Sequence, residues 1–118
     1  MIVDCHTHLN TDPQAELNFI FETGEYPIDA CILHGNIGPS STEINKALAE
    51  YVKKYEGKMV GFAYIDPTKD DINLKSVKAM TYDLGLKGVV LYCSNCGFHP
   101  AHSRAMRFYD VAQELKLP

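Results

Sequence analysis

Long apolar runs and an excess of basic residues are both missing from this sequence. Its apolar stretches are far shorter than the ~20 residues that a membrane-spanning helix requires, so we expect no membrane partner. The N-terminus lacks the basic region, apolar segment and cleavage site of a signal peptide. The formal net charge is −4, which disfavours nucleic acid as a partner because phosphate binding needs a basic surface.

Cysteine is scarce and unevenly placed. The four cysteines, Cys5, Cys31, Cys93 and Cys96, are too few to form the disulfide framework of a small secreted protein. Such usage predicts a reduced, cytoplasmic protein. Length and composition are those of a globular chain, with 118 residues of which 46% are hydrophobic and 22% are charged. We therefore expect residues 1–118 to form one domain.

Short apolar runs alternate with segments of helical periodicity along the whole chain. The runs recur at intervals of ~28 residues, a spacing that is typical of β–α units and a parallel sheet. The predicted strands are residues 2–5, 30–33, 59–65 and 88–91.

Capping residues and apolar periodicity predict a helix after each strand. The predicted first residues are Asp12 with Pro13 after it, residues 40–42, Asp70 or Asp71, and Ser103. Glu43 completes a capping box in the second helix, and Gly24 and Gly85 end the first and third. The predicted apolar stripes are Leu17, Ile20 and Phe21; Ile44, Ala47, Leu48, Tyr51, Val52 and Tyr55; Leu74, Val77, Met80 and Leu84; and Phe108, Val111, Ala112 and Leu115.

Two architectures contain such units. A doubly wound sheet has helices on both faces and is complete at about this length. A TIM-type (β/α)8 barrel has eight units in ~250 residues, with all helices outside. Since 118 residues hold four units, we predict an α/β fold made of four β–α units of a parallel (β/α)8 TIM-type barrel, a half-barrel. All helices should then cover the sheet face that carries Val3 and Cys5.

Two histidines, His6 and His8, lie one residue apart where the first strand ends. Side chains alternate along a strand, so Asp4, His6 and His8 are expected to share one face. In parallel β/α proteins the functional site lies at the carboxyl ends of the strands. Two neutral imidazoles on a rigid strand can bind one divalent ion, so we predict that His6 and His8 are metal ligands. The alternative is a pair of half-buried histidines that only make hydrogen bonds.

Three stretches resemble the amidohydrolase-2 family, which includes aminocarboxymuconate-semialdehyde decarboxylase. The opening VDCHTHLN is similar to the start of the metal-dependent amidohydrolase barrels. YVKKYEGKMVGFAYIDP and LGLKGVVLYCSNCGFHPAHSRAMRFYDVAQELKLP are similar to that family's later motifs, in the family's order. These motifs are G-F-A before an acidic residue and proline, L-G-x-K-G, G-F-x-P, and E-L-x-L-P. The resemblance spans essentially the whole chain but only the N-terminal half of the family's barrel.

The resemblance implies a mononuclear metal site, with zinc as the expected ion and His6 and His8 as ligands. The family's other ligands, a histidine after the fifth strand and an aspartate after the eighth, have no counterpart in this sequence, and no catalytic residue is assigned. The histidine that closes the fourth strand in many members is replaced by Tyr92. The implied enzyme is a metal-dependent hydrolase or non-oxidative decarboxylase acting on a small carboxylated or cyclic substrate. A missing C-terminal half, or a homo-oligomer, would complete the barrel.

Three further residues follow predicted strands and are candidates for substrate binding: His34, Asp66 and Tyr92. Asp66 precedes Pro67, so shaping a turn is the alternative role for it. For His34 the alternative is a place in a solvated loop.

Residues 93–102 contain the pattern C-x2-C-x2-H-x2-H, formed by Cys93, Cys96, His99 and His102. A structural zinc site and a reversible disulfide are two roles for such a loop. Structural zinc motifs separate their ligand pairs by a longer loop, so we expect these four to be incidental loop residues.

Two other functional classes share parts of the pattern. Metal-dependent phosphoesterases and DNases also begin with a His-x-His barrel strand, although they need several metals and more ligands. A catalytically inactive truncated barrel, or a binding module, would keep the histidine pair without the remaining ligands.

Overall fold

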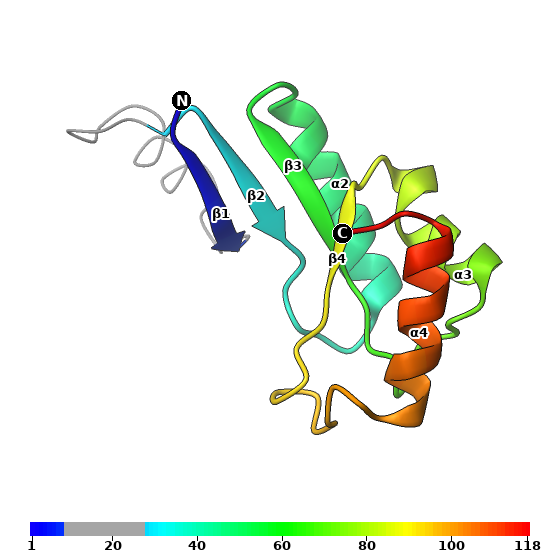
Figure 1. The fold of residues 1–118 in the computed structure, drawn as a ribbon. Coiled ribbons are helices and arrows are strands. Elements are labelled where there is room, and N and C mark those ends of the chain that lie inside the picture. The colour runs from blue at the N-terminus through cyan, green and yellow to red at the C-terminus, as the bar shows by residue number, and fades with distance from the viewer. Residues whose placement is uncertain (9–27) are drawn as a thin grey trace.

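The computed structural model describes residues 1–8 and 28–118. A four-stranded parallel sheet forms its centre, in the order β1-β2-β3-β4 (Figure 1). The strands are β1 (Val3–His8), β2 (Ala30–His34), β3 (Met59–Tyr64) and β4 (Gly88–Val90). All four strands occur where the sequence predicts them, although β1 continues three residues further, through both histidines. The first predicted helix, residues 12–24, lies outside the described residues.

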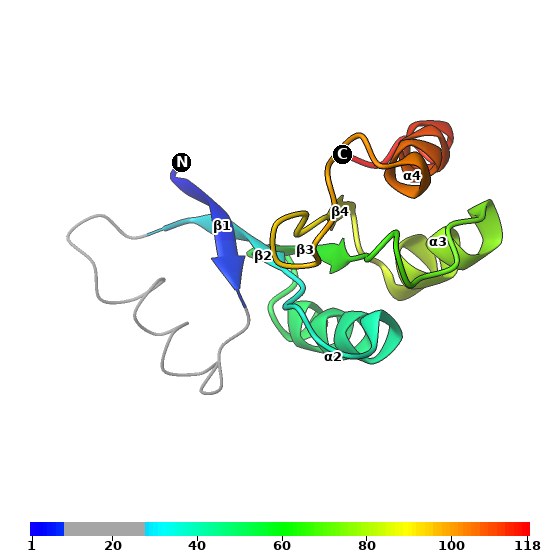
Figure 2. The same cartoon turned by 90° about the horizontal axis from the view of Figure 1, so that it is seen from below.

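Three α-helices cover one side of this sheet: α2 (Ser41–Lys54), α3 (Leu74–Met80) and α4 (Ser103–Glu114). Figure 2 shows them along the outer side of the curved sheet, with no helix of the described chain on the other side. This arrangement confirms the α/β class and the half-barrel architecture over the doubly wound alternative. No helix in the described ranges is long and apolar enough to cross a membrane.

Alternate strand residues form the core between the sheet and the helices. Cys31, Leu33, Met59 and Ala63 are buried on the helix side, where α2 packs against β2 and β3. A second buried cluster joins α3 and α4 to the end of β3. Its buried members are Ile65, Ile72, Val77, Met80, Phe108, Ala112 and Leu117. The opposite, concave face of the sheet is therefore left to the residues between these positions.

Helix α2 begins as predicted but turns a different face to the sheet. The Ser40 hydroxyl accepts a hydrogen bond from the Glu43 backbone amide at 3.3 Å, which caps the N-terminus. Asn45, not the predicted Ala47, is fully buried on the sheet side, and Ala47 is exposed. The predicted stripe missed Asn45 because periodicity counts apolar residues only.

Helix α3 is shorter than predicted. It begins after Asn73, whose side chain accepts a hydrogen bond from the Ser76 amide at 2.9 Å, and not at Asp70 or Asp71. The helix ends at Met80, and a 3-10 turn, η1 (Tyr82–Leu84), continues the apolar stripe. Gly85 ends that turn in the left-handed conformation, with φ of 78°, as its glycine predicts.

Strand β1 contains a bulge in its pairing with β2. Asp4 lies beside Cys31 and Thr7 lies beside Leu33, so three steps on β1 match two on β2. Because Cys31 and Leu33 point to the helix side, Asp4 and Thr7 also lie on that side.

Two expectations for this strand are therefore wrong. Asp4 does not share a face with His6 and His8, and Val3, which lies beside Ala30, is not on the helix side. The extra residue in the bulge reverses the alternation on which both expectations depended. His6 and His8 lie on the concave face.

Candidate functional site

Three histidine rings come together on the concave face, at the carboxyl ends of β1 and β2. The Nε2 atoms of His6 and His8 are 3.0 Å apart. The ring centroid of His34 lies 4.7 Å from that of His6 and 5.8 Å from that of His8. The bulge makes this cluster possible because it keeps His8 beside His34 while His6 projects from the same face.

Tyr92 reaches the histidines from the segment after β4. Its hydroxyl oxygen lies 3.2 Å from His8 Nδ1 and donates a hydrogen bond to the Gly35 carbonyl at 2.9 Å. Burial raises the pKa of Tyr92 to about 12. The phenol therefore keeps its hydrogen at neutral pH.

The hydrogen position on His34 follows from its partner. Its Nε2 lies 3.0 Å from the Cys5 carbonyl oxygen, which can only accept, so Nε2 carries the hydrogen. Nδ1 is the other ring nitrogen of His34. This atom is buried, the side chain is only 8% exposed, and no described residue donates a hydrogen bond to Nδ1.

Asp4 braces the bulge that positions His6. Its carboxylate accepts a hydrogen bond from the Thr7 hydroxyl at 2.6 Å and another from the His6 backbone amide at 2.9 Å. The Thr7 bond, followed by the His6 amide, lowers the pKa of Asp4 below its ordinary value. Asp4 thus supports the strand carrying the histidines from the helix side.

Aromatic side chains continue the concave face across β3. The Phe62 ring centroid lies 5.5 Å from that of His34, and the Tyr64 ring centroid lies 5.8 Å from that of Tyr92. Gly88 lies under the Phe62 ring, where a Cβ atom would come within 2.6 Å of the ring carbons. The glycine is therefore needed for the ring to lie flat against β4.

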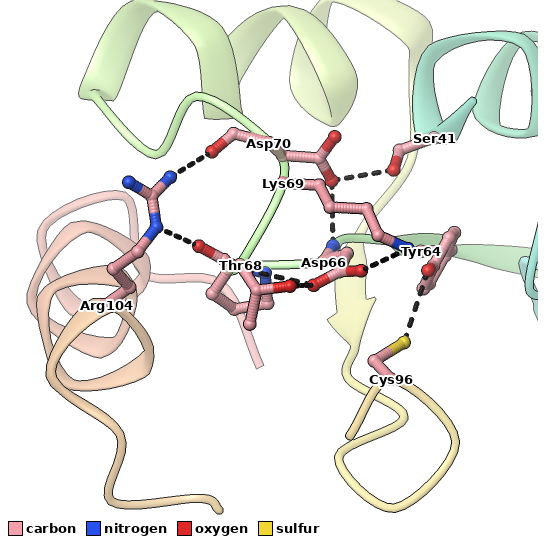
Figure 3. A network of polar contacts seen from close by, with 9 residues as sticks. Ser41, Tyr64, Asp66, Thr68, Lys69, Asp70, Cys96 and Arg104 are labelled. Carbon is pink, nitrogen blue, oxygen red and sulfur yellow. Dashed lines mark hydrogen bonds and ion pairs between the residues drawn. The ribbon is translucent and has the colours of Figure 1, made fainter. Parts of the chain in front are cut away.

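Tyr64 is the most buried of these aromatic residues, with 1% of its surface exposed. Its hydroxyl lies 3.3 Å from Cys96 Sγ (Figure 3). Burial raises the pKa of Tyr64, and the contact with Cys96 raises it further. The side chain is thus a neutral link between the sheet and the loop after β4.

Asp66 follows β3 and is held by its own turn. Oδ1 accepts hydrogen bonds from the Thr68 amide at 3.0 Å and the Thr68 hydroxyl at 2.6 Å, and Oδ2 lies 3.3 Å from Lys69 Nζ (Figure 3). Burial alone raises the pKa of Asp66, but the Thr68 bonds and the Lys69 charge outweigh burial and lower it. The carboxylate is engaged within the turn and does not join the three histidines.

The same turn is tied to two helices. Asp70 Oδ2 accepts hydrogen bonds from the Ser41 hydroxyl at 2.6 Å and the Asp66 amide at 2.7 Å. The Arg104 guanidinium, from the start of α4, donates to the carbonyls of Pro67 and Asp70 (Figure 3). These contacts join α2 and α4 beneath the end of β3.

Residues 93–102 form the loop that leads into α4, and His102 is the N-cap of that helix. The His99 Nδ1 atom accepts a hydrogen bond from the Ala101 amide at 3.1 Å, and His102 Nδ1 accepts one from the Arg104 amide at 3.3 Å. The Nδ1 atom of each imidazole thus accepts from a nearby backbone amide, and His102 caps the N-terminus of α4.

Metal-binding groups of three or more side chains are absent from the described ranges. No set of three His, Cys, Asp or Glu residues among residues 1–8 and 28–118 is placed to hold one ion. His6 and His8 are the two residues whose side-chain nitrogens point toward each other, and they would supply two imidazole ligands to an ion.

Four of the residues predicted from the sequence lie together in the structure: His6, His8, His34 and Tyr92. The fifth, Asp66, lies apart from them in its own turn. The sequence-based prediction did not include Phe62 and Tyr64, the aromatic residues on the concave face. The signal for them was present in residues 59–65, where alternation places both opposite the small residues of the helix side.

The sheet order, the helices on one side and the histidine cluster at the carboxyl ends define the class of fold. The chain has the architecture of the N-terminal part of a TIM-type (β/α)8 barrel. No protein-family model matches the chain. Glyceraldehyde-3-phosphate dehydrogenase 1 of Kluyveromyces marxianus is 45% identical over 53 residues, which are 42% of this chain and 16% of that protein.

Solved structures of particular enzymes match nearly the whole chain. The 5-carboxyvanillate decarboxylase of Novosphingobium aromaticivorans, with bound manganese and 3-methoxy-4-hydroxy-5-nitrobenzoic acid, matches with a TM-score of 0.68 and 18% identity. The match covers 93% of this chain and 33% of that enzyme. For the 2,6-dihydroxybenzoate decarboxylase of Rhizobium the TM-score is 0.65 with 16% identity, and the match covers 99% of this chain and 48% of that enzyme.

A hydrolase has the same fold. The probable 2-pyrone-4,6-dicarboxylic acid hydrolase of Acinetobacter baumannii, with citric acid bound, has a TM-score of 0.59 and 16% identity, covering 98% of this chain and 47% of that enzyme. The fold neighbours named here are thus two decarboxylases and one probable hydrolase. The chain spans less than half the length of each of these three enzymes.

Proposed function

We propose that His6 and His8 are ligands of one divalent metal ion in an amidohydrolase-type enzyme that acts on a small carboxylated substrate. One observation carries this proposal: their Nε2 atoms approach to 3.0 Å at the carboxyl end of β1. Metal–nitrogen bonds are about 2.0–2.1 Å long, so both atoms reach the same ion. The position agrees with the functional end of parallel β/α sheets.

The donor set fits a divalent ion but does not complete its coordination. Neutral imidazole suits zinc and several other transition metals. Two histidines supply about half of the protein ligands in a mononuclear site, so the remaining ligands lie outside the described residues. Zinc is our first candidate for the ion, and the manganese bound in the 5-carboxyvanillate decarboxylase structure makes manganese the second.

A divalent ion at this position would polarise a carboxylate or carbonyl group, or activate a water molecule, for decarboxylation or hydrolysis. The chain's own residues supply other functions. His34 borders His6 and His8 and stays a candidate for substrate contact. Phe62 and Tyr64 would exclude water from this side of the site.

The other predicted substrate contacts are Tyr92 and Asp66. Tyr92 borders the histidines and stays a candidate for substrate contact. The Asp66 carboxylate already contacts Thr68 and Lys69. To bind Asp66, a substrate would have to displace one of these two side chains. The sparse and unevenly placed cysteines of the sequence are the basis of our proposal of a reducing, cytoplasmic location.

Titration calorimetry tests the metal site directly. We expect the chain to bind one equivalent of Zn²⁺ or Mn²⁺, and the variants His6→Ala and His8→Ala each to lower the affinity at least about tenfold, because each removes one ligand. His99→Ala is the matched control, since that exposed histidine only caps a backbone amide. Its affinity should equal that of the unmodified chain.

Unchanged metal binding in the double variant of His6 and His8 would contradict the site and direct attention to residues 93–102. Catalysis is tested separately, by incubating the metal-loaded chain with aromatic and cyclic carboxylic acids and following loss of the carboxylate by chromatography. Turnover would support the enzyme, whereas metal binding without turnover would support the metal site alone.

A further inference from the structure

We propose that Cys93 and Cys96 form a redox-active dithiol, which closes to a disulfide by exchange with a small-molecule disulfide and thereby withdraws the Cys96 sulfur from Tyr64. Both cysteines belong to the segment after β4, where they form the C-x2-C part of the sequence pattern. Neither cysteine belongs to the proposed metal site, so this inference is independent of the proposed function.

The two cysteines lie in a single turn that has the cap of a helix C-terminus. The Phe98 amide donates a hydrogen bond to the Cys93 carbonyl at 3.0 Å, and the Gly97 amide donates one to the Ser94 carbonyl at 3.3 Å. Gly97 has the left-handed conformation, with φ of 70°. This pair of bonds around a left-handed glycine is the Schellman motif that ends helices. Cys96 directly precedes the glycine, so the cysteines lie at the start and the end of the turn.

The spacing of the two cysteines suits a disulfide. The Cys96 amide donates a hydrogen bond to the Tyr92 carbonyl at 2.8 Å, which spans four residues as in an α-helix. Residues three positions apart on such a turn are neighbours on its surface, with Cβ atoms about 5–6 Å apart. A disulfide needs Cβ atoms about 3.5–4.5 Å apart. A small tightening of the turn is therefore enough to join the two sulfurs.

Exposure distinguishes this pair from the other two cysteines. Cys93 and Cys96 are both partly exposed, and the two residues between them are exposed, so a small molecule can reach the turn. Cys31 is 1% exposed, in the core between the sheet and α2. Cys5 is exposed on β1 and lies outside the C-x2-C turn. It is therefore an internal reference for an accessible thiol without a neighbouring cysteine in the turn.

The disulfide forms by thiol–disulfide exchange. One protein cysteine, as its thiolate, attacks a sulfur of the small-molecule disulfide, forms a mixed disulfide and releases one small thiolate, which takes up a proton. The second protein cysteine then loses its proton, attacks the protein sulfur of the mixed disulfide and releases the second small thiol. Two protein thiols are thereby oxidised to one disulfide, and the small-molecule disulfide is reduced to two thiols. An excess of small thiol reverses both steps.

The reduced form has a contact that the disulfide loses. The Cys96 sulfur lies 3.3 Å from the Tyr64 hydroxyl (Figure 3), and Tyr64 is 1% exposed. In the disulfide the Cys96 sulfur turns toward Cys93 and has no hydrogen to donate. The contact with Tyr64 therefore favours the dithiol over the disulfide. Since the Tyr64 ring lies 5.8 Å from that of Tyr92, oxidation of the loop changes the surroundings of a buried residue on the concave face.

Redox equilibration of the full chain tests the cysteine pair directly. The chain is incubated with mixtures of oxidised and reduced glutathione, quenched with acid, alkylated and cleaved with trypsin for mass spectrometry. Trypsin cleaves after lysine and arginine, so it gives a peptide of residues 88–104 that contains Cys93 and Cys96 and no other cysteine. We expect this peptide to appear without alkyl groups and two hydrogens lighter than the dithiol, while Cys5 carries only mixed disulfides with glutathione.

A peptide of residues 88–104 found only with free thiols or glutathione adducts, under conditions that modify Cys5, would overturn the proposal. This measurement uses the unmodified chain, so its result does not depend on the folding of any variant.

Tyr64→Phe tests the link to the concave face, because it keeps the ring and removes the hydroxyl that contacts Cys96. We expect the glutathione ratio at half oxidation to shift about threefold toward easier oxidation, because a contact that favours the dithiol is lost. Tyr82→Phe is the matched control, since its hydroxyl donates to the Leu115 carbonyl at the other end of α4 from the cysteine loop. It should leave the ratio unchanged. No shift in Tyr64→Phe, or an equal shift in Tyr82→Phe, would contradict the withdrawal of the Cys96 sulfur from Tyr64.

Discussion

The Asp66 carboxylate shows how a buried charge is stabilised within a single turn. It is 1% exposed, yet its pKa lies below the ordinary value because Thr68 donates two hydrogen bonds and Lys69 lies within ion-pair distance. A lowered pKa in the folded chain means that folding favours the ionised form. The resulting stabilisation is present above the pKa of the unfolded chain and is lost as pH falls through the folded value.

We expect Asp66→Asn to lower the free energy of unfolding by roughly 1–3 kcal/mol at pH 7, because it removes the charge and an acceptor from a buried network. The difference from the unmodified chain should shrink as pH falls below about 4, where the unmodified carboxyl also loses its charge. Urea unfolding at pH 7 and pH 3 measures both values. Asp110→Asn, an exposed substitution on α4, is the control and should change stability little at either pH.

At the scale of elements, the end of β3 depends on a side chain from α2. Strand β2 ends at His34, so it provides no ladder partner for Tyr64. Asn45 takes its place: its amide nitrogen donates to the Tyr64 carbonyl and its amide oxygen accepts from the Tyr64 amide, both at 2.8 Å. A fully buried asparagine thus extends the sheet by one residue and fixes α2 against it.

Asn45→Ala should therefore be strongly destabilising. The substitution leaves a buried amide and a buried carbonyl of Tyr64 without partners, at a cost of about 1–3 kcal/mol for each group. Chemical denaturation followed by circular dichroism measures the loss. Asn95→Ala, in the exposed loop after β4, is the matched control, with an expected change within about 0.5 kcal/mol.

A cost for Asn45→Ala no larger than that of the control would show that water replaces the side chain. The hydrogen bonds from Asn45 would then contribute little to the position of β3.

At the scale of the whole molecule, the described chain is a curved wall with helices on one side and an open concave face on the other (Figure 2). Strands β1 and β4 are the edges of the sheet in the described part, because each pairs with one other strand there. At the outer edge of β4, the Val89 amide donates a hydrogen bond to the Pro118 carbonyl. Val60, on the concave face, is 39% exposed. Such edges and faces favour association in solution.

We expect a polypeptide of these 118 residues alone to self-associate at micromolar concentration. Association would cover the concave face and pair the strand edges, and a two-fold dimer is the commonest closed form. Light scattering coupled to size-exclusion chromatography measures the mass. A monodisperse 13.2 kDa monomer across that range would contradict this prediction and indicate a self-sufficient sheet.

Much of the fold was predictable because its signals are local. Strand positions follow from apolar runs. The starts of α2 and α4 follow from polar residues that can cap a helix, at Ser40 and near Ser103. The boundaries of α3 were not predictable to the residue, since Asp70, Asp71 and Asn73 are all suitable caps. The helix begins after Asn73 because Asp70 is occupied by Ser41 and the Asp66 amide, contacts that only the folded chain makes.

The sequence by itself determined the alternation of strands and helices, and the place of His6 and His8 at the end of the first strand. These features depend on residues close together in the chain. Only the tertiary structure decided the bulge at Asp4, the isolated nitrogen of His34, and the reach of Tyr92 to His8. Those features depend on the register and curvature of the sheet. Both are set by the pairing of all four strands, so no local pattern in the sequence predicts them.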